Sequence, residues 1–175
     1  MKQGRAVSTY LLGFMIAVML SACGFHLRSA ADTNLPFKTI YLGFPESSPL
    51  GIELRRNIRG GSNTEVLPTA KEAQASLVVL SETRDKSVLS LNNLGRVREY
   101  SLGYTLRFRV TDDKGQELLA PTEITLKRDI NYDESQVLAK EGEEAMLYRD
   151  MQKDLVQQIL RRLAAIKPLS PTDSN

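Results

Sequence analysis

The segment Glu99–Thr111 has the sequence EYSLGYTLRFRVT, and its hydrophobic pattern decides the fold. Apolar or aromatic side chains occupy every second position, and small, polar or basic side chains occupy the positions between them. Successive side chains of a β-strand point to opposite faces of the sheet, so this alternation predicts a strand with one core face and one polar face. We expect the core face to hold Tyr100, Leu102, Tyr104, Leu106, Phe108 and Val110.

Further strands are predicted on both sides of this segment. Asp113-Lys114-Gly115 has the residues of a tight turn, so we expect a hairpin that leads into a strand at about 123–132. Upstream, short apolar runs predict strands at 39–42, 64–67 and 75–80. Val88 and Leu91 leave open a continuation of the last of these strands.

Two segments have helical periodicity instead. Leu50, Leu54 and Ile58 recur every four residues and predict a short amphipathic helix, which Gly60-Gly61 should end by adopting the left-handed conformation of a C-terminal cap. A longer helix is predicted from Ser135 to about Ile166, ended by Pro168. Its apolar stripe is expected to be Tyr148, Met151, Leu155, Ile159, Leu163 and Ile166.

The order of these elements predicts an α+β fold. The first predicted strand is followed by the short helix, a run of strands comes next, and the long helix comes last. We therefore expect a single domain in which two helices pack on one face of a roughly four-stranded mixed or antiparallel sheet. The domain is predicted to span residues 37–167, followed by a disordered tail at 168–175.

The N-terminal segment has the features of a bacterial lipoprotein signal. Lys2 and Arg5 precede an apolar run, Leu11–Leu20, that is too short to cross a bilayer as a helix. The residues Leu20-Ser21-Ala22-Cys23 then resemble a lipobox. This predicts a cleaved signal peptide at 1–22. The alternative is an ordinary signal peptide whose cleavage site happens to precede a free cysteine.

The lipobox resemblance implies a lipid anchor at Cys23. The thiol would carry a diacylglycerol, and the amine freed by cleavage would carry a further acyl chain such as palmitate. Two acyl signals already suffice for stable membrane attachment. Gly24 follows the cysteine where retention in the inner membrane would favour Asp, so the sorting pattern indicates the inner leaflet of the outer membrane. Residues 23–36 are expected to form the anchor and a tether.

Removal of the signal peptide changes the electrostatic interpretation. It holds two of the 23 basic residues and none of the 21 acidic ones, which leaves 21 of each. A net charge of zero gives no support to nucleic-acid binding. Charge is nevertheless uneven, because Arg84–Arg109 is mainly basic and Asp112–Asp154 mainly acidic. The basic segment could attract an anionic partner, although such charges more often form a solvated surface with scattered pairs.

The sequence lacks the usual signs of catalysis. His26 is the only histidine and stands three residues from the predicted anchor, so it cannot form a metal or triad constellation with a second histidine. The carboxylates Glu141, Glu143 and Glu144 fit a helix surface. Gly60-Gly61 lacks the Lys-Ser/Thr that completes a phosphate loop. We expect no catalytic residue, no metal and no cofactor, and hence a binding or scaffolding protein.

Several short motifs resemble the LptE family of lipopolysaccharide-assembly lipoproteins. The mature chain begins Cys23-Gly24-Phe25-His26-Leu27-Arg28, which is the most specific of them. Gly95 followed by Glu99-Tyr100 opens the long strand. Tyr132-Asp133 and then Leu138-Ala139-Lys140-Glu141 open the long helix.

This resemblance implies partners and a location. Members form a one-to-one complex with the outer-membrane β-barrel LptD, sit partly inside it as a plug, and bind lipopolysaccharide. Because lipid A is phosphorylated, basic side chains on a rigid strand suit it. We expect contacts from Arg96 and Arg98 at the entrance of the long strand and from Lys127 and Arg128 on its hairpin partner. For each of the four, an ordinary surface or ion-paired role is the alternative.

Arg128 raises a separate structural question. It falls on the apolar face of the strand at 123–132, where a charged group needs a partner. It should therefore pair with a carboxylate at the sheet margin or lie beyond the core.

Two other functions stay open at this point. One is an outer-membrane lipoprotein that supports another envelope complex, linked to peptidoglycan or to barrel assembly, without binding lipopolysaccharide. The other is a lipid-anchored periplasmic hydrolase, which would need a pair of carboxylates facing a cleft.

Overall fold

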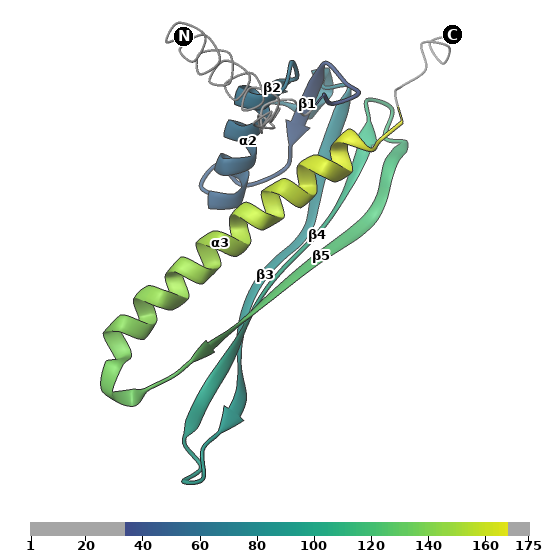
Figure 1. Ribbon diagram of the computed structural model, residues 1–175. Helices are drawn as coiled ribbons and strands as arrows, with labels where there is room; N and C mark the ends of the chain where they lie inside the picture. The colour runs from purple at the N-terminus through teal and green to yellow at the C-terminus, as the bar shows by residue number, and fades with distance from the viewer. Residues whose placement is uncertain (1–33, 168–175) are drawn as a thin grey trace, which may run out of the picture. The chain divides into compact units, whose positions relative to one another are not determined.

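The computed structural model describes residues 34–167 (Figure 1). The predicted signal peptide, the lipidation site Cys23 and the predicted tail at 168–175 lie outside the described residues. The helices and strands of this part of the chain are, in order, β1 (Thr39–Leu42), α2 (Pro49–Gly61), β2 (Glu65–Leu67), β3 (Ala75–Leu91), β4 (Val97–Asp112), β5 (Glu117–Asn131) and α3 (Val137–Ala164).

The strands form one mixed sheet in the order β2-β1-β3-β4-β5. β1 lies parallel to both β2 and β3, and β3, β4 and β5 form an antiparallel meander. Figure 1 shows α2 and α3 on the same face of this sheet. The α+β prediction, with two helices on one face, is therefore confirmed. The sheet has five strands rather than roughly four, because the three-residue β2 pairs with β1 as an edge strand.

The alternation in the long central strand gives the predicted core face. Leu102, Tyr104, Leu106, Phe108 and Val110 are all fully buried, and only Tyr100, near the start of β4, is half-buried. The hairpin after β4 is also confirmed, and Gly115 adopts a positive φ of 81° in its turn. β5 begins at Glu117, earlier than predicted, because register shifts opposite Phe108–Thr111 accommodate Pro121 within the strand.

The helix α3 supplies the other side of the core. Its predicted stripe is confirmed, with Met151, Leu155, Ile159 and Leu163 fully buried against the sheet. The helix begins at Val137, after a 3₁₀ turn at Glu134–Gln136, rather than at Ser135. The side chain of Asp133 caps that turn by accepting a hydrogen bond from the Ser135 amide.

The predicted glycine cap of α2 is wrong. Gly60 and Gly61 belong to the helix, and neither adopts a positive φ. Ser62 ends the helix in an extended conformation, and both its amide and its hydroxyl donate to the Ile58 carbonyl, at 3.0 and 2.8 Å. A serine that supplies two donors satisfies the terminal carbonyl without a left-handed residue.

The β3–β4 hairpin extends well past the part of the sheet that α2 covers (Figure 1). β3 has 17 residues and continues through Val88 to Leu91, the extension that the sequence left open. The connection to β4 turns at Asn92–Gly95, where Gly95 has a φ of 73°. We call residues 88–98 the hairpin tip.

Candidate functional site

Arg96 and Arg98 lie at the hairpin tip, where β4 begins. Their side chains are 64% and 66% exposed. Arg96 forms an ion pair with Glu134 at 3.2 Å, and Arg98 lies 3.5 Å from Glu99. Because exposed pairs of this kind contribute at most about 1 kcal/mol, both guanidinium groups can exchange these carboxylates for another anion.

Lys127 and Arg128 lie in the middle of β5, opposite Gly103 and Leu102 of β4. Consecutive residues of a strand point to opposite faces, so the two cations do not act on one surface. Arg128 pairs with Asp154 of α3 at 2.7 Å, which confirms the expectation of a carboxylate partner at the sheet margin. Lys127 has no ion pair among residues 34–167.

The four predicted contacts therefore do not form one site: Arg96 and Arg98 lie together at the tip, whereas Lys127 and Arg128 lie on opposite faces of β5. The carbonyl of Arg98 accepts a hydrogen bond from the Tyr132 amide, whereas Arg128 sits opposite Leu102. The four-residue separation between Arg98 and Leu102 corresponds to about 13 Å of extended strand. An anionic ligand that engages both the tip and Arg128 must span this distance, and the tip arginines are more exposed than Arg128, which is 42% exposed.

The hairpin tip also exposes apolar side chains. Leu94 is 80% exposed, and Leu138, at the start of α3, is 84% exposed. Three more tip residues are over half exposed: Val88, Leu89 and Leu91. Large aliphatic side chains are usually buried, so a group of them on the surface is unusual. Because these apolar residues lie beside Arg96 and Arg98, the tip is amphipathic.

A layer of cations and aromatic rings joins the hairpin to α3. The Arg84 guanidinium lies 4.4 Å from the Tyr104 ring centroid and 5.4 Å from that of Tyr148 on α3. It also donates to the Tyr104 hydroxyl at 3.1 Å and to Gln152 at 3.2 Å. Arg84 is therefore held in place by β4 and α3 and is not free to bind a ligand.

Lys86 continues this layer towards the tip. Its ammonium lies 4.3 Å from the Tyr100 ring centroid and pairs with Glu144 of α3 at 2.6 Å. Tyr100 in turn packs edge-on against Tyr132, with centroids 5.1 Å apart. The hydrogen bond with Glu144 is the main cause that raises the pKa of Lys86 above its ordinary value. The lysine thus stays charged at neutral pH.

Tyr104 is the most strongly perturbed titratable group in this layer. Burial, and secondly its hydrogen bond to Glu82 at 2.6 Å, raise the pKa of Tyr104 to about 12. Glu99, next to the tip, shifts the other way: the hydrogen bond from Ser90, and to a lesser degree Arg98, lower the pKa of this carboxyl group. The raised pKa keeps the Tyr104 phenol neutral and the lowered pKa keeps the Glu99 carboxylate ionised at neutral pH, so the two shifts do not create a poised acid and base pair.

The sequence pattern did not single out Arg84 and Lys86 as structural residues. A signal for them is nevertheless present, because Glu82, Arg84 and Lys86 alternate along β3 in the same way as the core residues of β4. The register places Arg84 opposite Tyr104. Recognition of this pairing needed the extent of β3, which the sequence left undecided.

Residues 34–167 contain no group of three or more His, Cys, Asp or Glu side chains placed to hold a metal ion. In the same range, no helix is long and apolar enough to span a membrane. Cys23 and His26 lie outside that range.

Taken together, the described domain is a mixed five-stranded sheet with two helices on one face and an amphipathic, basic hairpin tip. The family described as LptE, lipopolysaccharide-assembly, matches residues 37–163, and the chain belongs to this family. The family's description assigns the chain to lipopolysaccharide assembly, a role that is consistent with a non-enzymatic protein.

The chain is similar to individual relatives over most of their length. The chain is 28% identical over 160 residues to the LPS-assembly lipoprotein LptE of Pectobacterium atrosepticum, a match covering 90% of this chain and 85% of the relative. The solution NMR structure of lipoprotein B from Nitrosomonas europaea is 40% identical, with a TM-score of 0.70, covering 81% of this chain and 91% of that one. The crystal structure of rare lipoprotein B from Shewanella oneidensis is 26% identical, with a TM-score of 0.63 and coverage of 73% and 94%.

Proposed function

We propose that the protein is an outer-membrane lipoprotein that binds lipopolysaccharide through its hairpin tip and forms a one-to-one complex with the β-barrel LptD. The lipid on Cys23 holds it in the inner leaflet, and the domain enters the barrel lumen as a plug. The observation that carries this proposal is the juxtaposition at the tip of two exposed arginines, Arg96 and Arg98, with exposed leucines.

The chemistry of the tip matches that of lipopolysaccharide. The guanidinium groups of Arg96 and Arg98 can each donate paired hydrogen bonds to a phosphate of lipid A. The apolar side chains of Leu91 and Leu94 can lie against its acyl chains and remove them from water. One site would therefore contact both the phosphates and the acyl chains of the ligand. Lys127, with no ion pair among the described residues, offers a second and weaker contact along β5.

The face of the sheet opposite the helices suits a polar barrel lumen. Thr105 and Thr125 lie on neighbouring strands there, with their hydroxyl oxygens 3.1 Å apart. Arg107 is exposed, and Arg109 lies 3.7 Å from Glu117. A polar face of this kind stays compatible with water until it meets the polar interior of a barrel.

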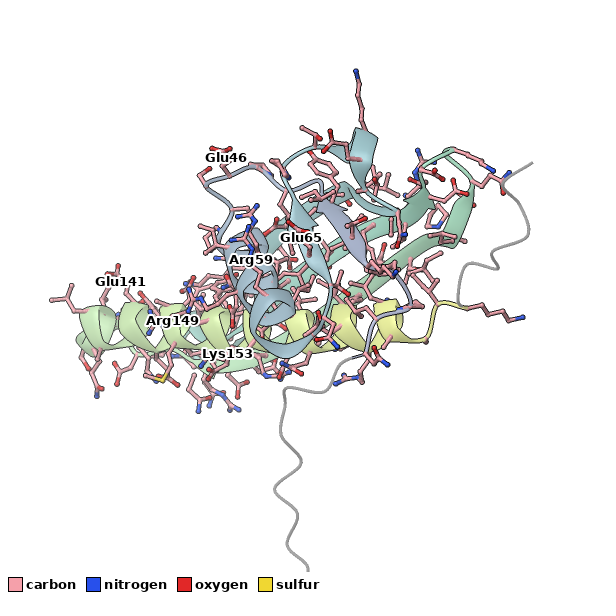
Figure 2. All side chains as sticks on the ribbon, turned by 90° about the horizontal axis from the view of Figure 1, so that it is seen from above. Glu46, Arg59, Glu65, Glu141, Arg149 and Lys153 are labelled. Carbon is pink, nitrogen blue, oxygen red and sulfur yellow. The ribbon has the colours of Figure 1, made fainter. Side chains whose placement is uncertain are left out.

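Lipopolysaccharide binding is tested by charge reversal at the tip. The double variant R96E/R98E should bind purified lipopolysaccharide about tenfold more weakly, because it replaces two phosphate donors with repelling carboxylates. A matched control is R149E/R161E, which reverses two exposed charges on α3, where Figure 2 labels Arg149. Equal losses in the two variants would show only a general charge effect, and unchanged binding in R96E/R98E would remove the tip from the proposal.

The two basic residues of β5 are tested separately. The variants K127E and R128E should each weaken binding less than R96E/R98E. For R128E this is because Arg128 already pairs with Asp154. A larger loss from K127E than from the tip variant would move the main contact to β5.

The complex is tested by extracting the native lipoprotein from outer membranes in mild detergent and measuring the mass of what co-purifies. A stoichiometric β-barrel with the mass of LptD is the expected result, together with a mature N-terminus acylated at Cys23. A lipoprotein that comes out alone, or attached to peptidoglycan, would contradict the plug assignment. An unmodified cysteine would contradict the anchor.

A further inference from the structure

We infer that a pocket between α2 and the strands β1 and β2 binds a small anionic amphiphile, that is, a carboxylate or phosphate group joined to an aliphatic chain. This site is separate from the hairpin tip. β3 begins beside β1 at Ala75 and reaches the tip at Leu91, so the pocket and the tip lie at opposite ends of that strand (Figure 1).

The pocket follows from the β1–α2–β2 unit. Because the two strands are parallel, Leu42 and Leu67 end them at the same edge of the sheet, and the helix that connects them passes beside that edge. The resulting half-open cavity has a volume of about 600 Å³. This volume lies within the range typical of small-molecule sites.

The floor of the pocket is apolar. Leu42, Phe44 and Val66 lie beneath it, and each is at most 7% exposed, so they offer only a narrow apolar surface to a ligand. Leu67 and Pro68 lie nearer the solvent. An aliphatic chain placed on this floor would be removed from water at a gain of roughly 25 cal/mol per Å² of apolar surface.

One wall of the pocket carries two unpaired cations. Arg55 and Arg59 are four residues apart on α2, so they lie on the same face of the helix. Neither guanidinium has a hydrogen-bond or ion-pair partner within residues 34–167, and Arg55 is half-buried. Two like charges at this spacing repel each other, and an anion between them would remove that repulsion.

The one acidic residue of the lining does not neutralise this wall. Glu46 lies on the loop that leads into α2 and forms no ion pair with Arg55 or Arg59 within the described chain. Figure 2 shows Glu46 on that loop, apart from the Arg59 side chain beside α2. A cationic headgroup would therefore face two positive charges and one negative charge, which disfavours it.

The combination of floor and wall favours an amphiphile over simpler ligands. A free phosphate would use the two guanidinium groups and leave the more exposed apolar residues Leu67 and Pro68 in contact with water. An extended peptide would gain little from pairing with β2, which has only three residues. An aliphatic chain with one terminal anion uses both features of the pocket.

The test uses the mature lipoprotein held in amphipol, titrated calorimetrically with octyl phosphate, octanoate, octanol, inorganic phosphate and the acidic peptide acetyl-Leu-Glu-Leu. We expect octyl phosphate and octanoate to bind more tightly than octanol or inorganic phosphate. In the double variant R55Q/R59Q, the affinity for octyl phosphate should fall about tenfold or more, because charge-assisted hydrogen bonds to the anion are lost. Glutamine keeps a polar side chain that is tolerated on the surface of α2.

The matched control is R56Q, because Arg56 is adjacent on the same helix, is exposed and does not line the pocket. Its affinity for octyl phosphate should stay within about twofold of the unmodified protein, since no anion contact is lost. Thermal unfolding of all variants verifies that the fold is kept. Lipopolysaccharide binding by R55Q/R59Q should be unchanged, which separates this site from the tip.

Four results would overturn the proposal. If R56Q loses as much affinity as R55Q/R59Q, the arginines of the pocket have no special role. If octanol binds as tightly as octyl phosphate, the site is merely apolar. If inorganic phosphate binds as tightly, the site recognises a free anion. If the acidic peptide acetyl-Leu-Glu-Leu binds and octyl phosphate does not, the pocket receives a protein partner instead.

Discussion

The Arg84 guanidinium lies over the ring of Tyr104, 4.4 Å from its centroid, and donates a hydrogen bond of 3.1 Å to the hydroxyl group of the same tyrosine. The two residues face each other across β3 and β4. Through Tyr148 and Gln152 the same guanidinium also contacts α3. One side chain therefore joins both strands of the hairpin to the helix, at the place where the apolar core ends.

We expect R84L to lower the free energy of unfolding by about 1 kcal/mol, because it removes the cation–π contacts and leaves the Tyr104 hydroxyl with one partner fewer. R84K should lower the free energy of unfolding by less than R84L, because lysine keeps the positive charge. It should still be less stable than the unmodified protein, because lysine lacks the planar group that stacks on the ring. Urea denaturation measures both. If R84K is as destabilised as R84L, the stacking geometry rather than the charge supplies the stabilisation.

Stability should fall at high pH through Tyr104. Its pKa is raised to about 12 in the folded protein, compared with about 10 when unfolded, so the folded state favours the protonated phenol. The resulting stabilisation is fully present below about pH 10 and is lost as the pH rises through 12. Urea denaturation between pH 9 and 12 should show this loss, and Y104F should reduce it. Identical pH profiles for the two proteins would assign the loss to other groups.

Two glycines of α2 should respond oppositely to alanine. A Cβ at Gly51 would lie 2.5 Å from the Phe44 Cβ, so G51A must displace that ring and should destabilise the protein by about 1–3 kcal/mol. Nothing lies within 4 Å of a Cβ at Gly60. G60A should therefore stabilise the helix by about 0.5–1 kcal/mol. Thermal unfolding of both variants measures these changes in stability. Two changes of the same sign would contradict the assigned packing.

The buried apolar stripe of α3 should account for most of the stability that this helix contributes to the protein. Leu155 is fully buried against the sheet, and L155A should lower the free energy of unfolding by about 2–5 kcal/mol. Met146, on the same helix, is 56% exposed. M146A should therefore change stability by no more than about 0.5 kcal/mol. Chemical denaturation of the pair checks this difference. A large loss in M146A would mean that the start of α3 is packed more tightly than its exposure shows.

Local patterns predicted the elements that have strong periodicity. The alternation of Leu102–Val110 placed the core face of β4, because a strand with a buried face must alternate. The spacing from Met151 to Ile166 likewise placed the buried stripe of α3. Patterns without strong periodicity were less informative. The middle of β3, residues 81–87, is polar and gives no hydrophobic signal, since its side chains Arg84 and Lys86 contact aromatic rings instead of a closed core.

Local chemistry also misled in one place. Gly60-Gly61 has the composition of a left-handed cap, yet Ser62 ends α2 by hydrogen bonding to Ile58. The end of a helix depends on which donor satisfies its free carbonyl groups, and residues other than glycine can supply such a donor. Two of the basic candidates were expected at the entrance of the long strand and two on its hairpin partner, but the distance between the two pairs follows from the register between β4 and β5.

The sequence by itself determined the class of fold, the faces of the central strand and the long helix, and the resemblance to the LptE family. These features depend on residue order and on the fixed periods of helix and strand. Only the tertiary structure decided that β1 pairs in parallel with β2 and β3, that Arg84 joins the hairpin to α3, and that Arg55 and Arg59 line a pocket. These relationships depend on contacts between segments far apart in the chain, which local propensity does not encode.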